Sequence, residues 1–429
     1  MAFGPLAQTF YFDSFRAEAG RVVFEYSTDA EHHFTHEITH AFPVGVDSTS
    51  LAPALFAFGM AELAHYWKAI LAPKIVVRVG ALNTEQVAFW ENLYRKGLGE
   101  FFFKNQIDFR DLIHIESAGD APQILPTATN GSGALVPFGG GKDSLVTAEL
   151  LKAKGVAFSW FEIEPLSFAP KLQEVSGVTS VVRMERNAQK NFAPIVELVK
   201  SGAPNGHVPI SATYMLSAVL AAKACGYSDV VMSLERSANF GNTEYLGQEI
   251  NHQYSKSFEF EQAIQKYVHT YIDPSVTVFS LLRRLYEIQI VQRFVEYPQY
   301  FPYFISCNKG LKTTSWCGAC AKCAFIFATL SAFLPPETVV TIFKKNLFED
   351  ESLVPLYVDM IGKGGMKPFD CVGTFEENHL ALYLAGEQYR KAGTDLPIVL
   401  RSLPIAEGEA HMHLLTDMTD EHVIPPTYA

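Results

Sequence analysis

Three consecutive glycines followed by Lys-Asp-Ser constrain the fold of this 429-residue chain more than any other feature. They follow a short apolar segment, 134–138, and precede a segment, 143–154, with the pattern of a helix. Glycines at such a junction let the backbone approach a ligand closely, and N–H groups at the helix start point toward an anion. We therefore expect a phosphate-binding loop made of Gly139, Gly140, Gly141, Lys142, Asp143 and Ser144.

Apolar segments typical of strands alternate with helical segments around this loop. We expect strands at 134–138, 156–163, 179–184 and 229–234, and helices at 143–154 and 211–225. The alternation predicts an α/β fold whose parallel sheet carries helices on both faces. Ligands of such sheets bind outside the carboxyl ends of the strands, which is where the glycine loop lies.

The chain is too long for one hydrophobic core of usual size, so we expect two or three domains. Turn-forming residues over 118–133 mark a boundary. Residues 1–125 are expected to form an N-terminal α+β domain, and residues 126–300 the glycine-loop domain. Residues 301–429 should form a helical C-terminal part. We also expect a long amphipathic helix at 276–295.

The net charge of −12 argues against a nucleic-acid partner, which would need a local basic patch. The densest basic run contains Arg283 and Arg284, and we predict that it is a solvated face of the expected helix. The N-terminus lacks the pattern of a signal peptide. The longest uncharged apolar stretch, 323–334, is about half as long as a membrane span requires. We therefore expect a cytoplasmic protein with no membrane partner.

Four of the six cysteines are clustered with the spacing C-x9-C-x2-C-x2-C. In a cytoplasmic protein such clusters indicate metal binding more often than disulfides. Two residues between thiolates let both reach one tetrahedral ion. We therefore expect structural zinc bound by Cys307, Cys317, Cys320 and Cys323. The alternatives are reduced cysteines at a helix start or an iron–sulfur cluster. Cys225 is expected in the core, whereas Cys371 is either buried or a reactive thiol.

The residues around the glycines exclude two common phosphate-binding motifs. A Walker A loop needs Gly, four residues, then Gly-Lys-Ser/Thr, whereas Val136 and Asp143 occupy its first and last positions. The dinucleotide-binding pattern needs a third glycine where Ser144 stands. The loop instead resembles the PP-loop, Ser-Gly-Gly-x-Asp-Ser, of the ATP pyrophosphatases, with Gly139 in place of the first serine. An ordinary strand-to-helix turn is the alternative.

The resemblance to the PP-loop implies that the loop grips the β- and γ-phosphates of ATP while the α-phosphate is attacked. The products would be an AMP-activated substrate and diphosphate. A hydroxyl contact is lost at Gly139, where a backbone N–H could replace it, and Lys142 could add positive charge near the phosphates. Deazaguanine synthases, which are PP-loop enzymes, have a similar C-terminal cysteine cluster that holds zinc.

Longer strings resemble the UDP-N-acetylmuramoyl-L-alanyl-L-glutamate epimerase (MurL) family over the whole chain. They lie at 138–145, 237–242, 249–257, 316–320 and 367–374. The resemblance implies an ATP- and Mg²⁺-dependent isomerase that inverts the terminal L-glutamate of UDP-MurNAc-L-Ala-L-Glu to D-glutamate, as peptidoglycan requires. The N-terminal domain would help to bind this substrate.

The implied chemistry is consistent with the loop. A proton next to a carboxylate is weakly acidic, because its removal would place two negative charges together. An acyl-adenylate removes one charge and makes the carbonyl a better electron sink. A base can then take the α-proton, and reprotonation on the other face inverts the centre. Hydrolysis releases AMP, and Mg²⁺ would neutralise the phosphate charge.

Inversion needs proton carriers on both faces of the carbon. The residues expected in catalysis are Lys142, Asp143, Glu235, His252, Lys256 and Cys371. The residues expected to bind the sugar or peptide are Asn239, Asn242, Asn251, Gln253, Tyr254, Ser255 and Ser257. Tyr254 could also carry a proton, and Lys256 could instead bind phosphate or a carboxylate.

Three other functions fit parts of the pattern. In a PP-loop ligase of the amide-forming or deazaguanine type, ammonia or another nucleophile would capture the adenylate, but small ligases of this kind do not need the N-terminal domain. A tRNA-modifying adenylating enzyme is disfavoured by the acidic charge. A zinc-stabilised nucleotide-binding module without activity would leave Asp143 and Ser144 idle.

Overall fold

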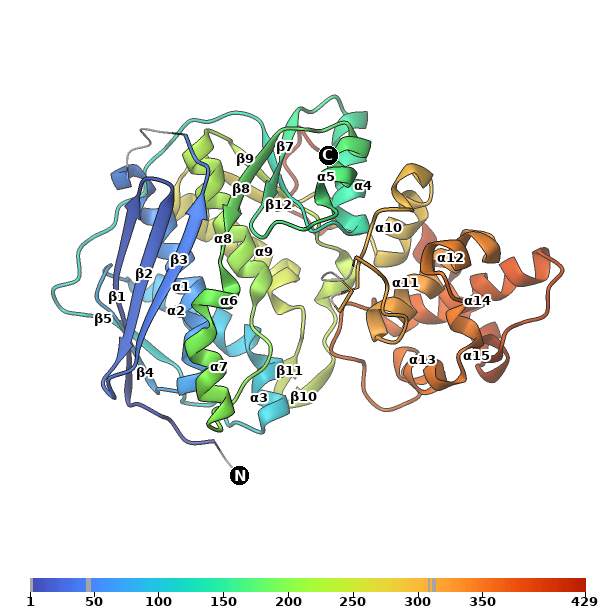
Figure 1. Cartoon of the computed structure of the whole chain (residues 1–429), viewed down its shortest axis with the longest axis horizontal. Coiled ribbons are helices and arrows are strands. Elements are labelled where there is room, and N and C mark those ends of the chain that lie inside the picture. The colour runs from blue at the N-terminus through green and yellow to red at the C-terminus, as the bar shows by residue number, and fades with distance from the viewer. Residues whose placement is uncertain (1–2, 44–47, 308, 311–313) are drawn as a thin grey trace.

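The computed structural model describes residues 3–43, 48–307, 309–310 and 314–429. It has two bodies (Figure 1): an α/β body built on one ten-stranded sheet, and a helical body formed by the C-terminal part of the chain. The α/β class expected from the sequence is confirmed. Among the described residues, no helix is long and apolar enough to cross a membrane.

Five parallel strands form one half of the sheet, in the order β12-β9-β6-β7-β8. Their bounds are β6 (Ala134–Pro137), β7 (Phe158–Glu162), β8 (Val181–Glu185), β9 (Asp229–Met232) and β12 (Thr277–Ser280). Leu135 packs into the core that contains α8 (Ile210–Cys225), whereas Val136 packs into the core that contains α4 (Lys142–Ala153). Neighbouring residues of β6 therefore face opposite cores, and helices cover both faces as expected.

The other five strands extend this sheet without a break. Their bounds are β1 (Thr9–Glu18), β2 (Arg21–Thr28), β3 (His33–His40), β4 (Lys74–Val77) and β5 (His114–Ser117). β1, β2 and β3 are antiparallel, and β4 and β5 continue parallel to β1. β3 joins the parallel half through an antiparallel pairing with β8 (Thr39 with Glu185, His40 with Met184). The strands on the two sides of the expected boundary at residue 125 thus belong to one sheet. The division into domains stays a prediction.

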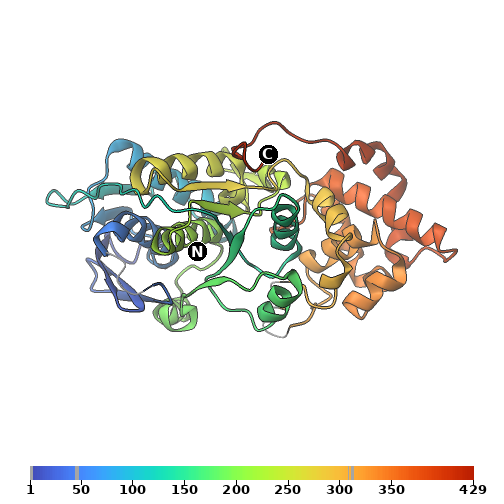
Figure 2. The ribbon, with the colours of Figure 1, turned by 90° about the horizontal axis from the view of Figure 1, so that it is seen from above.

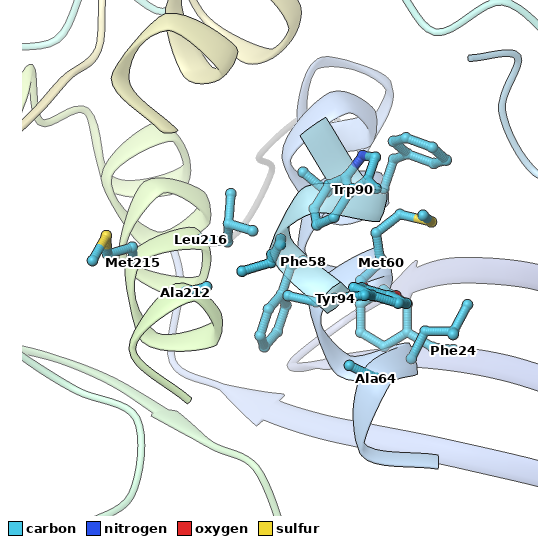
Figure 3. Packing of buried hydrophobic residues seen from close by; sticks show 14 of the residues in the cluster. Phe24, Phe58, Met60, Ala64, Trp90, Tyr94, Ala212, Met215 and Leu216 are labelled. Carbon is cyan, nitrogen blue, oxygen red and sulfur yellow. The ribbon is translucent and has the colours of Figure 1, made fainter. Parts of the chain in front are cut away.

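The long helix α1 (Ser48–Ile70) lies at the centre of the N-terminal half. It packs against β1 and α8, so it is buried on nearly all sides and most of its residues are apolar. Figure 3 shows side chains of α1, α8 and α2 (Thr84–Gly97), among them Phe58, Leu216 and Trp90, in the core between these helices.

The segment 276–295 corrects one expectation. It is not a single helix but strand β12, a turn, and the shorter helix α10 (Glu287–Phe294). A short apolar run cannot be assigned to strand or helix by periodicity alone. Here Val278 and Phe279 pair with β9 and are fully buried, and this tertiary pairing decides for a strand.

The helical body begins at the cysteine cluster, since Cys323 lies in its first helix. Its helices are α11 (Ala321–Ser331), α12 (Pro336–Phe343), α13 (Val354–Met360), α14 (Phe375–Lys391) and α15 (Ile398–Ser402). The last residues then run back over the α/β body (Figure 2), where the Lys154 Nζ donates to the Ala429 carbonyl at 2.7 Å. The remaining α-helices and strands are α3 (Gly99–Asn105), α5 (Ala169–Ser176), α6 (Ala188–Asn191), α7 (Ala193–Lys200), α9 (Phe258–Tyr267), β10 (Thr243–Tyr245) and β11 (Gln248–Ile250).

Candidate active site

The glycine loop connects β6 to the N-terminus of α4. Gly140 has a φ of +70°, in the left-handed region that favours glycine, and a Cβ there would lie 2.3 Å from the Phe168 ring. Among the described residues, no heavy atom lies within 4 Å of where a Cβ on Gly139 would stand. Gly141 is the N-cap of α4 without a side-chain cap, so it leaves the first N–H groups of the helix available to an anion.

A cavity of about 580 Å³ opens in front of this loop, at the carboxyl ends of β6, β7 and β9. This is the place expected for a ligand of a parallel sheet. The residues expected at the site that line it are Gly139, Gly141, Asp143, Ser144, His252, Gln253, Ser255, Lys256 and Cys371. Those outside its lining are Gly140, Lys142, Glu235, Asn239, Asn242, Asn251, Tyr254 and Ser257. The structure brings the loop and the 252–256 segment to one cavity, and the roles of these residues stay predictions.

Lys142 does not face the cavity. Its side chain is fully buried and forms ion pairs with Asp143 and with Glu287 of α10. Burial raises the pKa of the Glu287 carboxyl to about 7, although the Lys142 ammonium acts to lower it. The cation that lines the cavity beside the loop is instead Lys322 of α11, which lies 3.7 Å from Glu287 and donates to the Cys371 carbonyl at 2.9 Å.

Cys371 meets two nitrogen groups at the cavity wall. The Lys256 Nζ lies 3.4 Å from its Sγ, and His252 lines the same cavity. Burial disfavours the thiolate, but these cationic groups outweigh burial and lower the pKa of Cys371 to about 6. A cysteine of this kind is a thiolate at neutral pH and can act as a nucleophile or accept a proton.

Several polar side chains that were expected to bind substrate form hydrogen bonds with backbone groups of the chain instead. Asn242 donates to the Pro368 carbonyl at 2.8 Å, and Asn251 donates to the Ala238 carbonyl at 2.9 Å. The Asn239 Oδ1 accepts the Phe258 N–H at 2.7 Å. Ser257 is the N-cap of α9 and accepts the Phe260 N–H at 3.3 Å. These bonds fix the course of the segment between β9 and α9, which carries His252 and Lys256 into the cavity.

Glu235 and Arg283 form a buried frame behind the cavity. Glu235 accepts a hydrogen bond from the Gln253 Nε2 at 2.7 Å. Burial disfavours its carboxylate, but Lys256 and Lys322 outweigh burial and hold the pKa of Glu235 at about 2.

Arg283 was expected on a solvated helix face, and this is wrong. Its side chain is fully buried, where it pairs with Glu261 and donates to the backbone carbonyls of Glu235 and Lys256, both at 2.6 Å. Residues 281–284 form a turn after β12 rather than part of a helix, and the Arg283 side chain is buried there.

The four clustered cysteines lie beside the glycine loop, and their geometry fits a tetrahedral ion. Their Sγ atoms all lie within 4.8 Å of one another, with 3.8 Å between Cys307 and Cys320 and 3.6 Å between Cys317 and Cys323. Ligand atoms about 2.3 Å from one zinc ion would lie about 3.8 Å apart, whereas a disulfide needs about 2 Å. The cluster is therefore compatible with zinc.

This cysteine segment also reaches the loop directly. The Ile305 N–H donates to the Gly140 carbonyl at 3.3 Å, and a Cβ on Gly141 would lie 2.9 Å from the Ser306 Oγ. Lys322, between two of the cysteines, lines the cavity. Part of the chain between the first two cysteines lies outside the described residues.

Among the polar residues of the cavity wall or its support that sequence reasoning missed are Glu100, His207, Ser306 and Lys322. Ser306 and Lys322 stand next to cysteines of the cluster, and that adjacency is the signal that could have found them. Glu100 carries no motif. It lies 152 residues from His252 in the sequence, and only the fold brings the two side chains together.

Comparisons with known proteins cover almost the whole chain. Residues 4–281 match the MurL N-terminal domain, and residues 303–412 match the MurL C-terminal domain. The chain belongs to the MurL family. No solved structure matches it.

Three members of this family illustrate the similarity, and each is named UDP-N-acetyl-alpha-D-muramoyl-L-alanyl-L-glutamate epimerase. The protein of a Micromonospora species is 33% identical over 99% of this chain and 97% of its own length. The protein of Xanthomonas oryzae pv. oryzae is 32% identical over 89% and 86%, respectively. The protein of Salinispora tropica is 32% identical over 92% and 87%.

Proposed function

We propose that this chain is an epimerase that inverts the terminal L-glutamate of UDP-MurNAc-L-Ala-L-Glu to D-glutamate through an acyl-adenylate, releasing AMP and diphosphate. The observation that carries the proposal is that one cavity is lined both by the glycine loop and by His252, Lys256 and Cys371. A phosphate-binding loop and groups able to move a proton thus face the same space. The names of the family members supply the substrate.

The loop would hold the triphosphate. The first N–H groups of α4 are available to phosphate oxygens, and the Lys322 ammonium adds positive charge on the cavity wall. Asp143 is the carboxylate of the loop that faces the cavity, and oxygen ligands of this type suit Mg²⁺. Mg²⁺ bound with ATP would lower the charge that the substrate carboxylate meets as it attacks the α-phosphate.

The adenylate makes the proton transfer feasible. In the free acid, removal of the α-proton would create a second negative charge beside the carboxylate. In the mixed anhydride the electron pair of the broken C–H bond moves onto the acyl oxygen instead. Lys256 is half-buried and keeps its ammonium beside Glu235 and Cys371, so it could stabilise that charge.

Zinc would be held by the four clustered cysteines and would supply structural support rather than a chemical step. Four thiolates complete a tetrahedral shell and leave no open position for a reactant. The chain between these residues would then hold Ile305 and Ser306 against the glycine loop.

The direct test is to incubate the purified protein with ATP, Mg²⁺ and UDP-MurNAc-L-Ala-L-Glu. Chiral chromatography of the hydrolysed product should show D-glutamate, and AMP should form only when that substrate is present. Absence of D-glutamate would contradict the proposal. AMP formed together with an amide of the substrate, in the presence of ammonia, would favour the ligase alternative. The double variant K256M/C371S should lose the inversion.

A further inference from the structure

We propose that Glu100 is a positioning residue, which through a hydrogen bond holds His252 as the cationic partner of a Cys371 thiolate facing the cavity. The three side chains would form a carboxylate–imidazole–thiolate chain, with Cys371 as the base that takes the substrate α-proton. The assignment of that proton transfer rests on the proposed function. The arrangement of the three groups does not, and it has its own test.

Glu100 is anchored at both carboxylate oxygens. It lies on α3, and its side chain is buried. The Lys104 Nζ donates to Oε1 at 2.5 Å, and Oε2 is in hydrogen-bond contact with the Nδ1 of His252. A carboxylate held in this way offers one oxygen, in a fixed direction, to the imidazole.

His252 is fixed on its other sides as well. Its backbone N–H donates to the Asn242 Oδ1 at 2.9 Å, and its ring packs against that of His207 with centroids 4.3 Å apart. Because Nδ1 faces Glu100, Nε2 is the ring nitrogen left for a partner on the cavity side, where Cys371 also lines the wall. One ring thus joins a residue of α3 to a residue of the C-terminal part.

The charges along the chain support a thiolate. Burial disfavours the imidazolium of His252, but its hydrogen bonds to Cys371 and Glu100 outweigh burial and raise its pKa to about 9. His207 beside it stays neutral, because burial lowers its pKa to about 3. The charged and titratable groups that face the pair are Glu100, Lys104, His207, Glu235, Lys256, Lys322, Lys367 and Asp370.

Removal of the Glu100 charge therefore has a defined direction. Without the carboxylate, His252 loses a partner that stabilises its cation, so its pKa falls. A neutral imidazole no longer favours the thiolate, so the pKa of Cys371 rises. Lys256 remains 3.4 Å away and limits the rise.

A bound metal ion is the alternative use of Glu100, His207 and His252, whose ligand atoms lie within 4.8 Å of one another. Metal analysis of the wild-type and Glu100→Gln proteins decides between the two uses.

In the proposed step the Sγ of Cys371 takes the α-proton while the C–H electron pair moves onto the acyl oxygen of the adenylate. A proton from solvent then returns to the opposite face of the carbon. The His252 cation keeps its proton throughout, and it stabilises the thiolate before the transfer.

The test measures the rate at which iodoacetamide alkylates Cys371 between pH 5 and 9, in the whole protein without ATP or substrate. Mass spectrometry of the peptide that contains Cys371 separates it from the other cysteines. In the wild type the rate should follow a pKa well below the usual 8.5 of a free cysteine. Glu100→Gln should raise that pKa by about 1–2 units and slow alkylation at pH 7 about two- to tenfold.

The controls separate this role from a structural one. Glu85→Gln, on α2, removes an exposed carboxylate paired with Lys266 and should leave the alkylation profile unchanged. Glu100→Asp should return the pKa of Cys371 part of the way to its wild-type value. His252→Gln should raise that pKa as Glu100→Gln does, and this result does not depend on how Glu100→Gln folds. In turnover, Glu100→Gln should lower kcat and leave the KM for ATP unchanged.

Two results would overturn the proposal. One is an alkylation profile that is the same in the wild type, Glu100→Gln and His252→Gln proteins. The other is a second equivalent of metal in the wild type that Glu100→Gln loses, because that would assign these residues to an ion. Neither result bears on ATP use or on D-glutamate formation.

Discussion

At the scale of single residues, the three glycines of the loop differ in what the fold requires of them. Gly140 needs the absence of a side chain twice, for its left-handed backbone and for the ring of Phe168. Gly139 has open space around it, although it stands where the PP-loop has serine. The departure from the PP-loop pattern is therefore not forced by packing.

The pair Gly140→Ala and Gly139→Ser tests this difference. The alanine should destabilise the loop by more than about 1–2 kcal/mol and weaken ATP binding at least tenfold, because it adds a clash to the cost of a left-handed conformation. The serine should leave the unfolding free energy within about 0.5 kcal/mol and tighten ATP binding by roughly 1 kcal/mol, since it restores a donor. Calorimetric titration measures the ATP affinity of both variants, and urea unfolding measures their stability. Equal effects of the two substitutions would contradict this account.

Arg283 and Arg284 are neighbours with opposite roles. Arg283→Met leaves the buried Glu261 carboxylate and two backbone carbonyls without their partner, so it should lower the free energy of unfolding by about 3–5 kcal/mol. Arg284→Met removes a pair with the exposed Asp420 and should cost less than about 1 kcal/mol. Urea unfolding of both variants decides the matter. A small effect of Arg283→Met would mean that the buried frame contributes little.

Single residues also show how much of the site can be predicted from the sequence. The glycine loop and the cysteine cluster were predicted because their chemistry depends on local spacing. The burial of Arg283 and the position of Glu100 depend on partners far along the chain, and a single sequence does not reveal these. From the sequence alone, a charged residue in an apolar segment is predicted to face solvent, because the element that covers it is not known.

At the scale of elements, the chain that carries the four clustered cysteines, from Ile305 to Cys323, lines the cavity and supports the glycine loop. It supplies Ser306 and Lys322 to the cavity and the Ile305 N–H to Gly140. The helix α11 begins within the cluster, so the direction of Lys322 follows from the position of the cysteines. A metal ion there would fix both ends of this segment.

Removal of the metal should therefore disturb the loop before it disturbs the sheet. Elemental analysis should find one zinc ion per chain. Chelation should speed hydrogen exchange at residues 138–141 and weaken ATP binding about fivefold, the effect of one hydrogen bond of about 1 kcal/mol. Exchange within β1, β2 and β3 serves as the internal control. A chelated protein with unchanged exchange at the loop would show that the cluster does not support it.

At the scale of the whole molecule, the N-terminal and glycine-loop segments share one sheet. β3 pairs with β8, α1 packs against α8, and the buried pair between Glu62 and Arg186, at 2.6 and 2.7 Å, links the two halves. The sequence predicted strands and helices in both segments, but not that their strands pair in one sheet. Strand partners that are distant in the chain leave no local pattern. The same holds for β12, which only its pairing with β9 distinguishes from a helix.

Residues 126–429 expressed alone should accordingly fail to form a stable fold. The edge of β8 and the apolar face of α8 would be exposed, and Arg186 would lose its buried partner. Circular dichroism during heating should show no cooperative transition. Co-expression with residues 1–125 should restore it. A monomeric fragment that unfolds cooperatively and binds ATP would instead establish an independent domain.

The central claim is that ATP activates a carboxylate so that its α-proton can be removed. The reaction in D₂O tests this claim most directly, with the substrate analysed for deuterium at the terminal glutamate α-carbon. We expect one deuterium in each D-glutamate formed, with AMP in at least equal amount, and no exchange without ATP or with an analogue whose α,β-bridge resists cleavage. Exchange or inversion at the full rate without ATP would contradict the account.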